Sequence, residues 1–90
     1  MGAWFVYILR CADDTLYTGI TTDLARRARE HGEGRAGARY TRVRRPVQLV
    51  YSETVANRSE AARREAAIKK LSRTQKLLLL ETWQAPSQEP

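Results

Sequence analysis

At 90 residues the chain is long enough for one domain only, because a chain of this size buries about 60% of the surface that it exposes when unfolded. A single cysteine excludes an intramolecular disulfide and a cysteine-based zinc cluster, and is typical of a protein from the reducing cytosol. The longest apolar run, residues 3–9, is too short to span a bilayer and lacks the pattern of a secretion signal. We therefore expect a soluble, cytoplasmic protein.

The formal charge of +6 is concentrated in one segment of the chain. Residues 26–45 hold eight arginines and two acids, whereas the rest of the chain holds eight basic and eight acidic side chains, which cancel. Because the planar guanidinium group matches phosphate oxygens in pairs, this segment predicts binding to a polyanion, with nucleic acid as the leading candidate. The alternative is a solvated arginine-rich face without a specific partner.

The N-terminal part of the chain predicts a β-hairpin. Aromatic and β-branched residues predict two strands, at residues 3–10 and 15–20. A three-residue loop between them would place Asp14 in the left-handed conformation and pair Tyr7 with Gly19. Tyr7 and Tyr17 then share one face of the hairpin, whereas a two-residue loop would place them on opposite faces. We predict the three-residue loop.

A helix and a loop are expected next. Thr22 or Asp23 is suited to cap a helix that runs to about Gly32, where a glycine favours its end. Glycines and arginines dominate residues 32–46, which predicts an irregular loop. Residues 47–55 predict a third strand.

Two more helices are expected in the C-terminal half. One begins at Asn57 or Ser59 and extends to about residue 71, and the other begins at Ser72 and extends through four leucines to residue 83. The spacings of Asn57 to Glu60 and of Ser72 to Gln75 match capping boxes. We expect the last helix to supply much of the core. Residues 1–83 form the single domain, and the polar residues 84–90 predict a disordered tail.

Three ionisable residues fall on or beside apolar helix faces. Arg27 and His31 border the stripe centred on Leu24 and Ala28, and Glu65 lies on the apolar stripe of the second helix. An unpaired buried charge costs several kcal/mol, so such residues either pair with each other or surround a wet cleft. One interpretation is a buried ion pair between Arg27 and Glu65, and the other is an active site.

The neighbouring chemistry favours the active site. Tyr7, Tyr17 and Tyr40 can converge with an arginine, a histidine and a carboxylate beside the arginine-rich segment. Four stretches, "FVYIL", "YTG", "DLARRAREH" and "REAAIKK", then show a specific order and spacing between residue 4 and about residue 80. In this order they resemble the GIY-YIG nuclease superfamily, and in particular its small single-domain bacterial YhbQ-like group.

The resemblance implies an α+β fold in which a three-stranded antiparallel sheet, in the element order β-β-α-β-α-α, is flanked by helices. It also implies a metal-dependent phosphodiesterase site on the sheet, with Glu65 as the sole carboxylate ligand of one Mg²⁺ or Mn²⁺ ion. Gly19 would have a structural role, because a residue without a side chain allows close approach to the strand. The sequence departs from the family pattern at Phe5, Val6 and Ile20, and no asparagine follows Asn57.

By the same resemblance, Tyr17 or Tyr7 would help to activate the attacking water. Arg27 would stabilise the pentacovalent phosphorus, because a guanidinium suits spread negative charge. His31 or Tyr40 would orient water or phosphate nearby. A tyrosine acting as a base needs neighbouring cations to lower its pKa from about 10.

The expected activity is endonuclease-type hydrolysis of DNA, with RNA as an alternative substrate, with weak sequence specificity and a link to DNA repair or recombination. Nucleic acid would be bound by six arginines, namely Arg26, Arg35, Arg39, Arg42, Arg44 and Arg45. The protein would be a monomer or a weak homodimer. Two alternatives stay open: a nucleic-acid-binding module that does not cut, and an interaction domain whose basic face meets an acidic protein.

Overall fold

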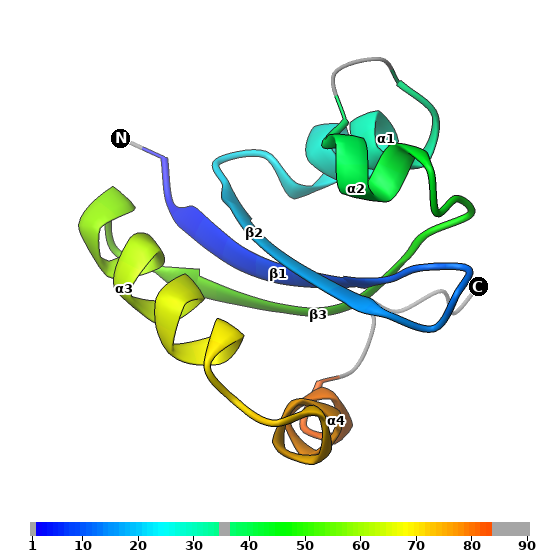
Figure 1. Ribbon diagram of the computed structural model, residues 1–90. Helices are drawn as coiled ribbons and strands as arrows, with labels where there is room; N and C mark the ends of the chain where they lie inside the picture. The colour runs from blue at the N-terminus through cyan, green and yellow to red at the C-terminus, as the bar shows by residue number, and fades with distance from the viewer. Residues whose placement is uncertain (1, 35–36, 84–90) are drawn as a thin grey trace, which may run out of the picture.

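The computed structural model describes residues 2–34 and 37–83, so the expected tail at 84–90 lies outside the described residues. A three-stranded antiparallel sheet forms its centre, with the strand order β2-β1-β3 (Figure 1). The strands are β1 (Trp4–Arg10), β2 (Leu16–Thr21) and β3 (Gln48–Val55). The fold class and the sheet agree with the expectation.

The hairpin between β1 and β2 has the predicted three-residue loop. Asp14 adopts a left-handed backbone with φ 67°, and its N–H donates to the Cys11 carbonyl at 2.8 Å. The Cys11 N–H donates to the Thr15 carbonyl at 2.9 Å and closes the loop. Tyr7 therefore pairs with Gly19, and the side chains of Tyr7 and Tyr17 lie on the same face of the sheet.

The described residues form four helices, of which three were expected from the local signals of the sequence and one short helix is additional. They are α1 (Leu24–Glu33), α2 (Arg39–Arg42), α3 (Arg58–Lys69) and α4 (Arg73–Glu81). Asp23 caps α1 by accepting the Arg26 N–H at 3.0 Å, and Asn57 caps α3 by accepting the Glu60 N–H at 2.9 Å. Ser72 opens α4 with a complete capping box. The expectation of a wholly irregular segment after α1 was wrong, since it contains the single turn of α2.

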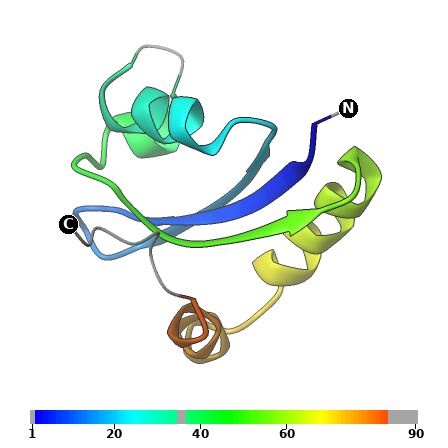
Figure 2. The ribbon, with the colours of Figure 1, turned by 180° about the vertical axis from the view of Figure 1, so that it is seen from behind.

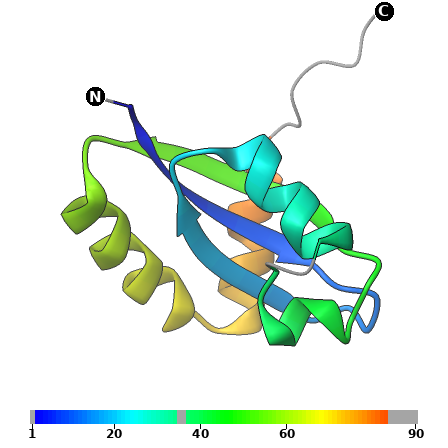
Figure 3. The same cartoon turned by 90° about the horizontal axis from the view of Figure 1, so that it is seen from above.

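The two faces of the sheet have different partners. Helices α1 and α2 cover one face, whereas α3 and α4 lie on the other side, as Figures 1 and 2 show. The main core lies on the second side and consists of five side chains: Val6, Ile8, Tyr51, Ala61 and Ile68. In the view from above, α3 runs beside β2 and α1 crosses the upper face (Figure 3).

Helix α4 contributes less to the core than expected. None of its side chains is buried; Leu79, Leu80 and the following Trp83 are only partly buried against the core, and the Leu78 side chain is 57% exposed. The expectation that α4 supplies much of the core was therefore wrong, because the buried helical side chains of this core, Ala61 and Ile68, come from α3. No helix among residues 2–34 and 37–83 has the length and apolar character needed to cross a bilayer.

Candidate active site

Tyr7 lies at the centre of the α1 face, on the middle strand of the sheet. Its side chain is 2% exposed and passes directly over Gly19 of β2. A Cβ atom at position 19 would lie 2.6 Å from the Tyr7 Cζ atom, closer than real Cβ contacts allow. The glycine is therefore required for Tyr7 to adopt this position, as the sequence predicted.

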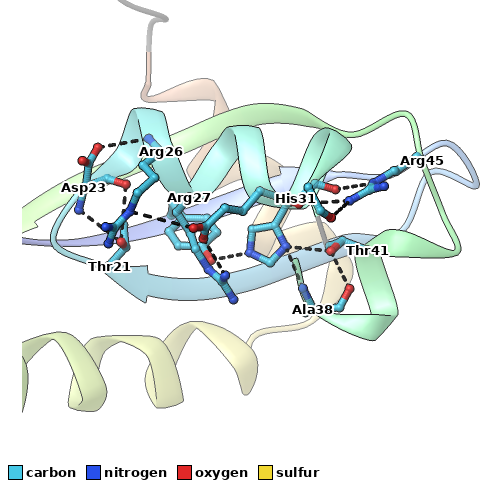
Figure 4. Close-up of polar contacts among 11 residues, drawn as sticks. Thr21, Asp23, Arg26, Arg27, His31, Ala38, Thr41 and Arg45 are labelled. Atoms are coloured by element: carbon cyan, nitrogen blue, oxygen red, sulfur yellow. Dashed lines mark hydrogen bonds and ion pairs between the residues drawn. The ribbon is translucent and has the colours of Figure 1, made fainter. Parts of the chain in front are cut away.

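His31 holds the Tyr7 hydroxyl from the helix above. The Tyr7 Oη and His31 Nε2 atoms are 2.8 Å apart, and the other ring nitrogen, Nδ1, lies 2.6 Å from the Thr41 hydroxyl (Figure 4). Within the described helix α1, His31 is the buried residue, and it is more buried than the apolar Leu24. With 0% exposure and both nitrogens in contact with protein groups, His31 can act only through its neighbours.

Tyr17 and Tyr40 extend the cluster toward the solvent. The centroid of the Tyr17 ring lies 5.1 Å from that of His31 and 5.8 Å from that of Tyr40. Tyr17 is half-buried and Tyr40 is 36% exposed, so both reach the surface, unlike Tyr7. The Arg44 guanidinium carbon lies 3.8 Å from the Tyr40 ring centroid and adds a cation beside the rings.

The charged members of the site approach Tyr7 from two helices. Arg27 of α1 pairs with Glu30 of the same helix at 2.9 Å and hydrogen-bonds to Tyr7. Glu65 of α3 is 24% exposed and pairs with Lys69 at 3.2 Å, yet its charge still raises the pKa of Tyr7. Arg27 therefore acts on Tyr7 more strongly than Glu65 does, whose charge has the smallest effect on the phenol.

The electrostatics of the site keep Tyr7 and His31 neutral at pH 7. Burial raises the pKa of Tyr7 to about 12, an effect that the hydrogen bond from Arg27 opposes only in part. Burial lowers the pKa of His31 to about 4, and the positive charge of Arg27 adds to this shift. The arginine that was expected to lower the tyrosine pKa is present, but desolvation is the larger effect.

The carboxylates of the site do not form a multidentate metal cage. Across residues 2–34 and 37–83, no three histidine, cysteine or acidic side chains gather in a way that could hold a metal ion. Glu65 and Glu30 each already have a basic partner, since Glu65 pairs with Lys69 and Glu30 pairs with Arg27. Of these two, Glu65 is the one whose charge acts on Tyr7.

The predicted nucleic-acid-binding arginines fall into three environments. Arg26, on α1, and Arg39 and Arg42, on α2, are exposed, whereas Arg35 lies outside the described residues. Arg44 donates to the Asp13 carboxylate at 3.0 Å and contacts the Tyr40 ring.

Arg45 is the exception among these arginines. Its guanidinium donates to the carbonyls of His31 at 2.7 Å, Glu30 at 3.0 Å and Gly34 at 2.5 Å, where α1 ends (Figure 4). The Glu30 carbonyl also accepts the Gly34 N–H at 3.0 Å, and Arg45 adds donors at the point where the helix runs out of backbone N–H groups, so it acts as a side-chain cap. These donors are directed at main-chain carbonyls of the protein.

Thr41 is the member of the site that the sequence analysis missed. It is fully buried within an arginine-rich turn, and its hydroxyl contacts His31 on one side and the Ala38 carbonyl, at 2.9 Å, on the other. A threonine between Tyr40 and Arg42, in an arginine-rich segment, carries no periodic or motif signal. Only the path of the chain from α1 to α2 shows that it faces the histidine.

Comparisons with known proteins show the family to which the chain belongs. The family model of the GIY-YIG catalytic domain matches residues 3–77. The UPF0213 protein of Desulfotalea psychrophila is 65% identical over 79 residues, which are 88% of this chain and 72% of that protein. The UPF0213 protein of Syntrophus aciditrophicus is 52% identical over 77 residues, which are 86% of this chain and 88% of that protein.

Two solution NMR structures have the same fold. The UPF0213 protein of Bacillus halodurans is 42% identical, with a TM-score of 0.57 over 89% of this chain and 84% of that one. A protein of E. faecalis is 43% identical, with a TM-score of 0.61 over 91% of this chain and 86% of that one. By its family model, its UPF0213 relatives and its fold, the chain belongs to the GIY-YIG catalytic-domain family, and this membership supports an endonuclease-type function.

Proposed function

We propose that the protein is a divalent-metal-dependent nuclease that hydrolyses phosphodiester bonds of DNA with little sequence specificity, in repair or recombination. The observation that carries this proposal is the convergence on Tyr7 of Arg27, His31, Tyr17 and the charge of Glu65, from two strands and two helices. Buried aromatic packing would not require an arginine, a histidine and a carboxylate at the same place. The exposed arginines Arg39 and Arg42 lie on α2, the helix that also carries Tyr40 and Thr41.

The site suits a substrate that supplies part of the metal coordination. Mg²⁺ retains several waters and binds to proteins through one or two carboxylates plus substrate phosphates, and Glu65 offers one such carboxylate. When bound, the ion would stabilise the charge that develops on the leaving oxygen. This donor set fits Mg²⁺ or Mn²⁺ better than zinc, which takes three or four nitrogen or sulfur ligands from the protein.

The protein side chains divide into those that reach the substrate and those that support them. Tyr17 reaches the surface and, as the tyrosinate, would take a proton from the attacking water; Tyr7 is less suited to this role because it is buried and keeps its own proton. Arg27 would bind the non-bridging phosphate oxygens, and Tyr40 would orient the phosphate from the exposed side. Tyr7 would hold Arg27 in position.

The test compares wild type with Glu65→Gln on labelled single-stranded, duplex and branched DNA, in Mg²⁺, in Mn²⁺ and in a chelator. We expect cleavage by wild type with metal only, and a loss on the order of 100-fold or more in Glu65→Gln, because the substitution removes the carboxylate that would hold the metal ion. DNA affinity should be retained. Glu81→Gln, an exposed carboxylate on α4 on the far side of the sheet, is the matched control and should cleave like wild type.

Two outcomes would contradict the proposal. Cleavage in chelator, or equal cleavage by wild type and Glu65→Gln, would show that this site does not cut. Salt-dependent binding without cleavage under any of these conditions would instead show a nucleic-acid-binding module that has kept the nuclease shape.

A further inference from the structure

Thr41 is a fully buried hydroxyl residue that contacts the site only through His31. We propose that Thr41 is a positioning residue: it holds His31 in the tautomer protonated on Nδ1, so that Tyr7 donates to Nε2 and presents a lone pair to Arg27. The inference rests on the proposed function for its catalytic consequence. The tautomer itself can be measured whether or not the protein cleaves DNA.

The proton on Tyr7 sets the direction of the hydrogen-bond chain. Tyr7 has one hydrogen to donate, and its hydroxyl contacts Arg27 and the Nε2 atom of His31. A guanidinium has donors only, so Arg27 cannot accept that hydrogen. Among the residues described around the phenol, His31 is therefore the acceptor, and a reversed bond would leave a buried phenolic hydrogen without a partner.

The remaining protons follow from this assignment. Because Nε2 accepts and the ring is neutral, His31 carries its hydrogen on Nδ1, where the Thr41 oxygen accepts it at 2.6 Å. Thr41 then donates its own hydrogen to the Ala38 carbonyl at 2.9 Å, a carbonyl that can accept a second bond beside the Arg42 N–H. The Ala38 N–H points at Nδ1 from 3.4 Å, which is too long to compete.

The hydrogen-bond chain thus runs in one direction, from Tyr7 through His31 and Thr41 to the Ala38 carbonyl. Each hydroxyl in it donates one hydrogen bond and accepts another. At its other end the Tyr7 oxygen accepts from Arg27. If His31 changed tautomer, the phenolic hydrogen would turn toward the guanidinium, and Arg27 would have to move. Thr41 would therefore control the position of the Arg27 guanidinium, which binds the phosphate in the proposed function.

The first measurement is the tautomer of His31 by long-range nitrogen–proton NMR on the ¹⁵N-labelled protein. The spectrum is unambiguous because the chain has one histidine. In wild type and in Thr41→Ser we expect Nδ1 protonated and Nε2 unprotonated, whereas Thr41→Val should lose this preference. A wild-type spectrum with the proton on Nε2 would overturn the inference, even if Thr41→Val fails to fold.

The second measurement is single-turnover cleavage of labelled DNA at saturating protein, together with DNA affinity. We expect Thr41→Val to slow cleavage roughly 10- to 100-fold, which is the usual effect of removing a group that orients a functional histidine. DNA affinity should be nearly unchanged, and Thr41→Ser should cleave at the wild-type rate. Thr18→Val is the matched control, since Thr18 is similarly buried but lies on the other face of the sheet.

The possible results separate the two claims. Thr41→Val with the wild-type tautomer and rate, or Thr41→Ser as slow as Thr41→Val, would overturn the role of Thr41. If wild type has the Nδ1 tautomer but never cleaves DNA, the proposed nuclease function fails while the hydrogen-bond chain stands.

Discussion

Gly19→Ala tests how Tyr7 is held, because the two residues are in direct contact across β1 and β2. The new Cβ atom would lie 2.6 Å from Tyr7 Cζ and 3.1 Å from Cε2, so the ring must move. Overpacking of this kind costs about 1–3 kcal/mol. Breaking the buried hydrogen bond to His31 costs about 1–3 kcal/mol more. The expected loss of unfolding free energy is therefore about 2–6 kcal/mol.

This loss is large for a domain of 90 residues, whose total stability is expected to be about 5–14 kcal/mol. Urea denaturation followed by circular dichroism gives the change in the midpoint, provided that the m-value is constant. Cleavage should fall as well, since the displaced ring no longer meets His31 and Arg27.

Gly32→Ala provides the matched control on the same face of the sheet. Gly32 lies within α1, and a Cβ atom there would meet only Val47 Cγ2, at 3.9 Å, which is an ordinary van der Waals contact. This substitution should stabilise the protein by about 0.5–1 kcal/mol, because alanine is the better helix former. A change in Gly19→Ala smaller than about 0.5 kcal/mol would refute the reasoning.

Three further predictions concern pH, capping and salt. The pKa of His31 is 6.5 in the unfolded chain and about 4 in the folded protein, so the contribution of His31 to stability is complete above pH 6.5 and is lost as the pH falls through 4. The difference of 6.5 − 4 pKa units corresponds to about 3 kcal/mol of unfolding free energy. His31→Gln should remove this part of the pH dependence of the urea midpoint. Arg45→Gln should destabilise the fold by about 2–3 kcal/mol, and an unchanged midpoint would argue against its capping role. If about five phosphates are contacted, log K for duplex DNA should fall with log salt with a slope near −4 to −5. Arg42→Gln should reduce that slope by about one, and a slope near zero would contradict phosphate binding.

The sequence by itself determined the elements whose causes are local. Asp14 in the hairpin loop, and the caps Asp23, Asn57 and Ser72, act through hydrogen bonds to residues within a few positions along the chain. The loop length in turn set the strand register, which placed Tyr7 over Gly19. Such features can be predicted because the interacting groups are close in sequence, and tertiary packing only has to leave them intact.

The tertiary structure alone decided which groups meet across the chain. Thr41 faces His31 and Arg45 caps α1 only because the segment after α1 turns back along that helix. The small share of α4 in the core likewise depends on tertiary packing, since the buried helical side chains of the core come from α3. Tyr7 stays protonated because burial raises its pKa more than Arg27 lowers it. The size of this burial effect depends on how completely the fold excludes water, which cannot be read from the pattern of residues along the chain.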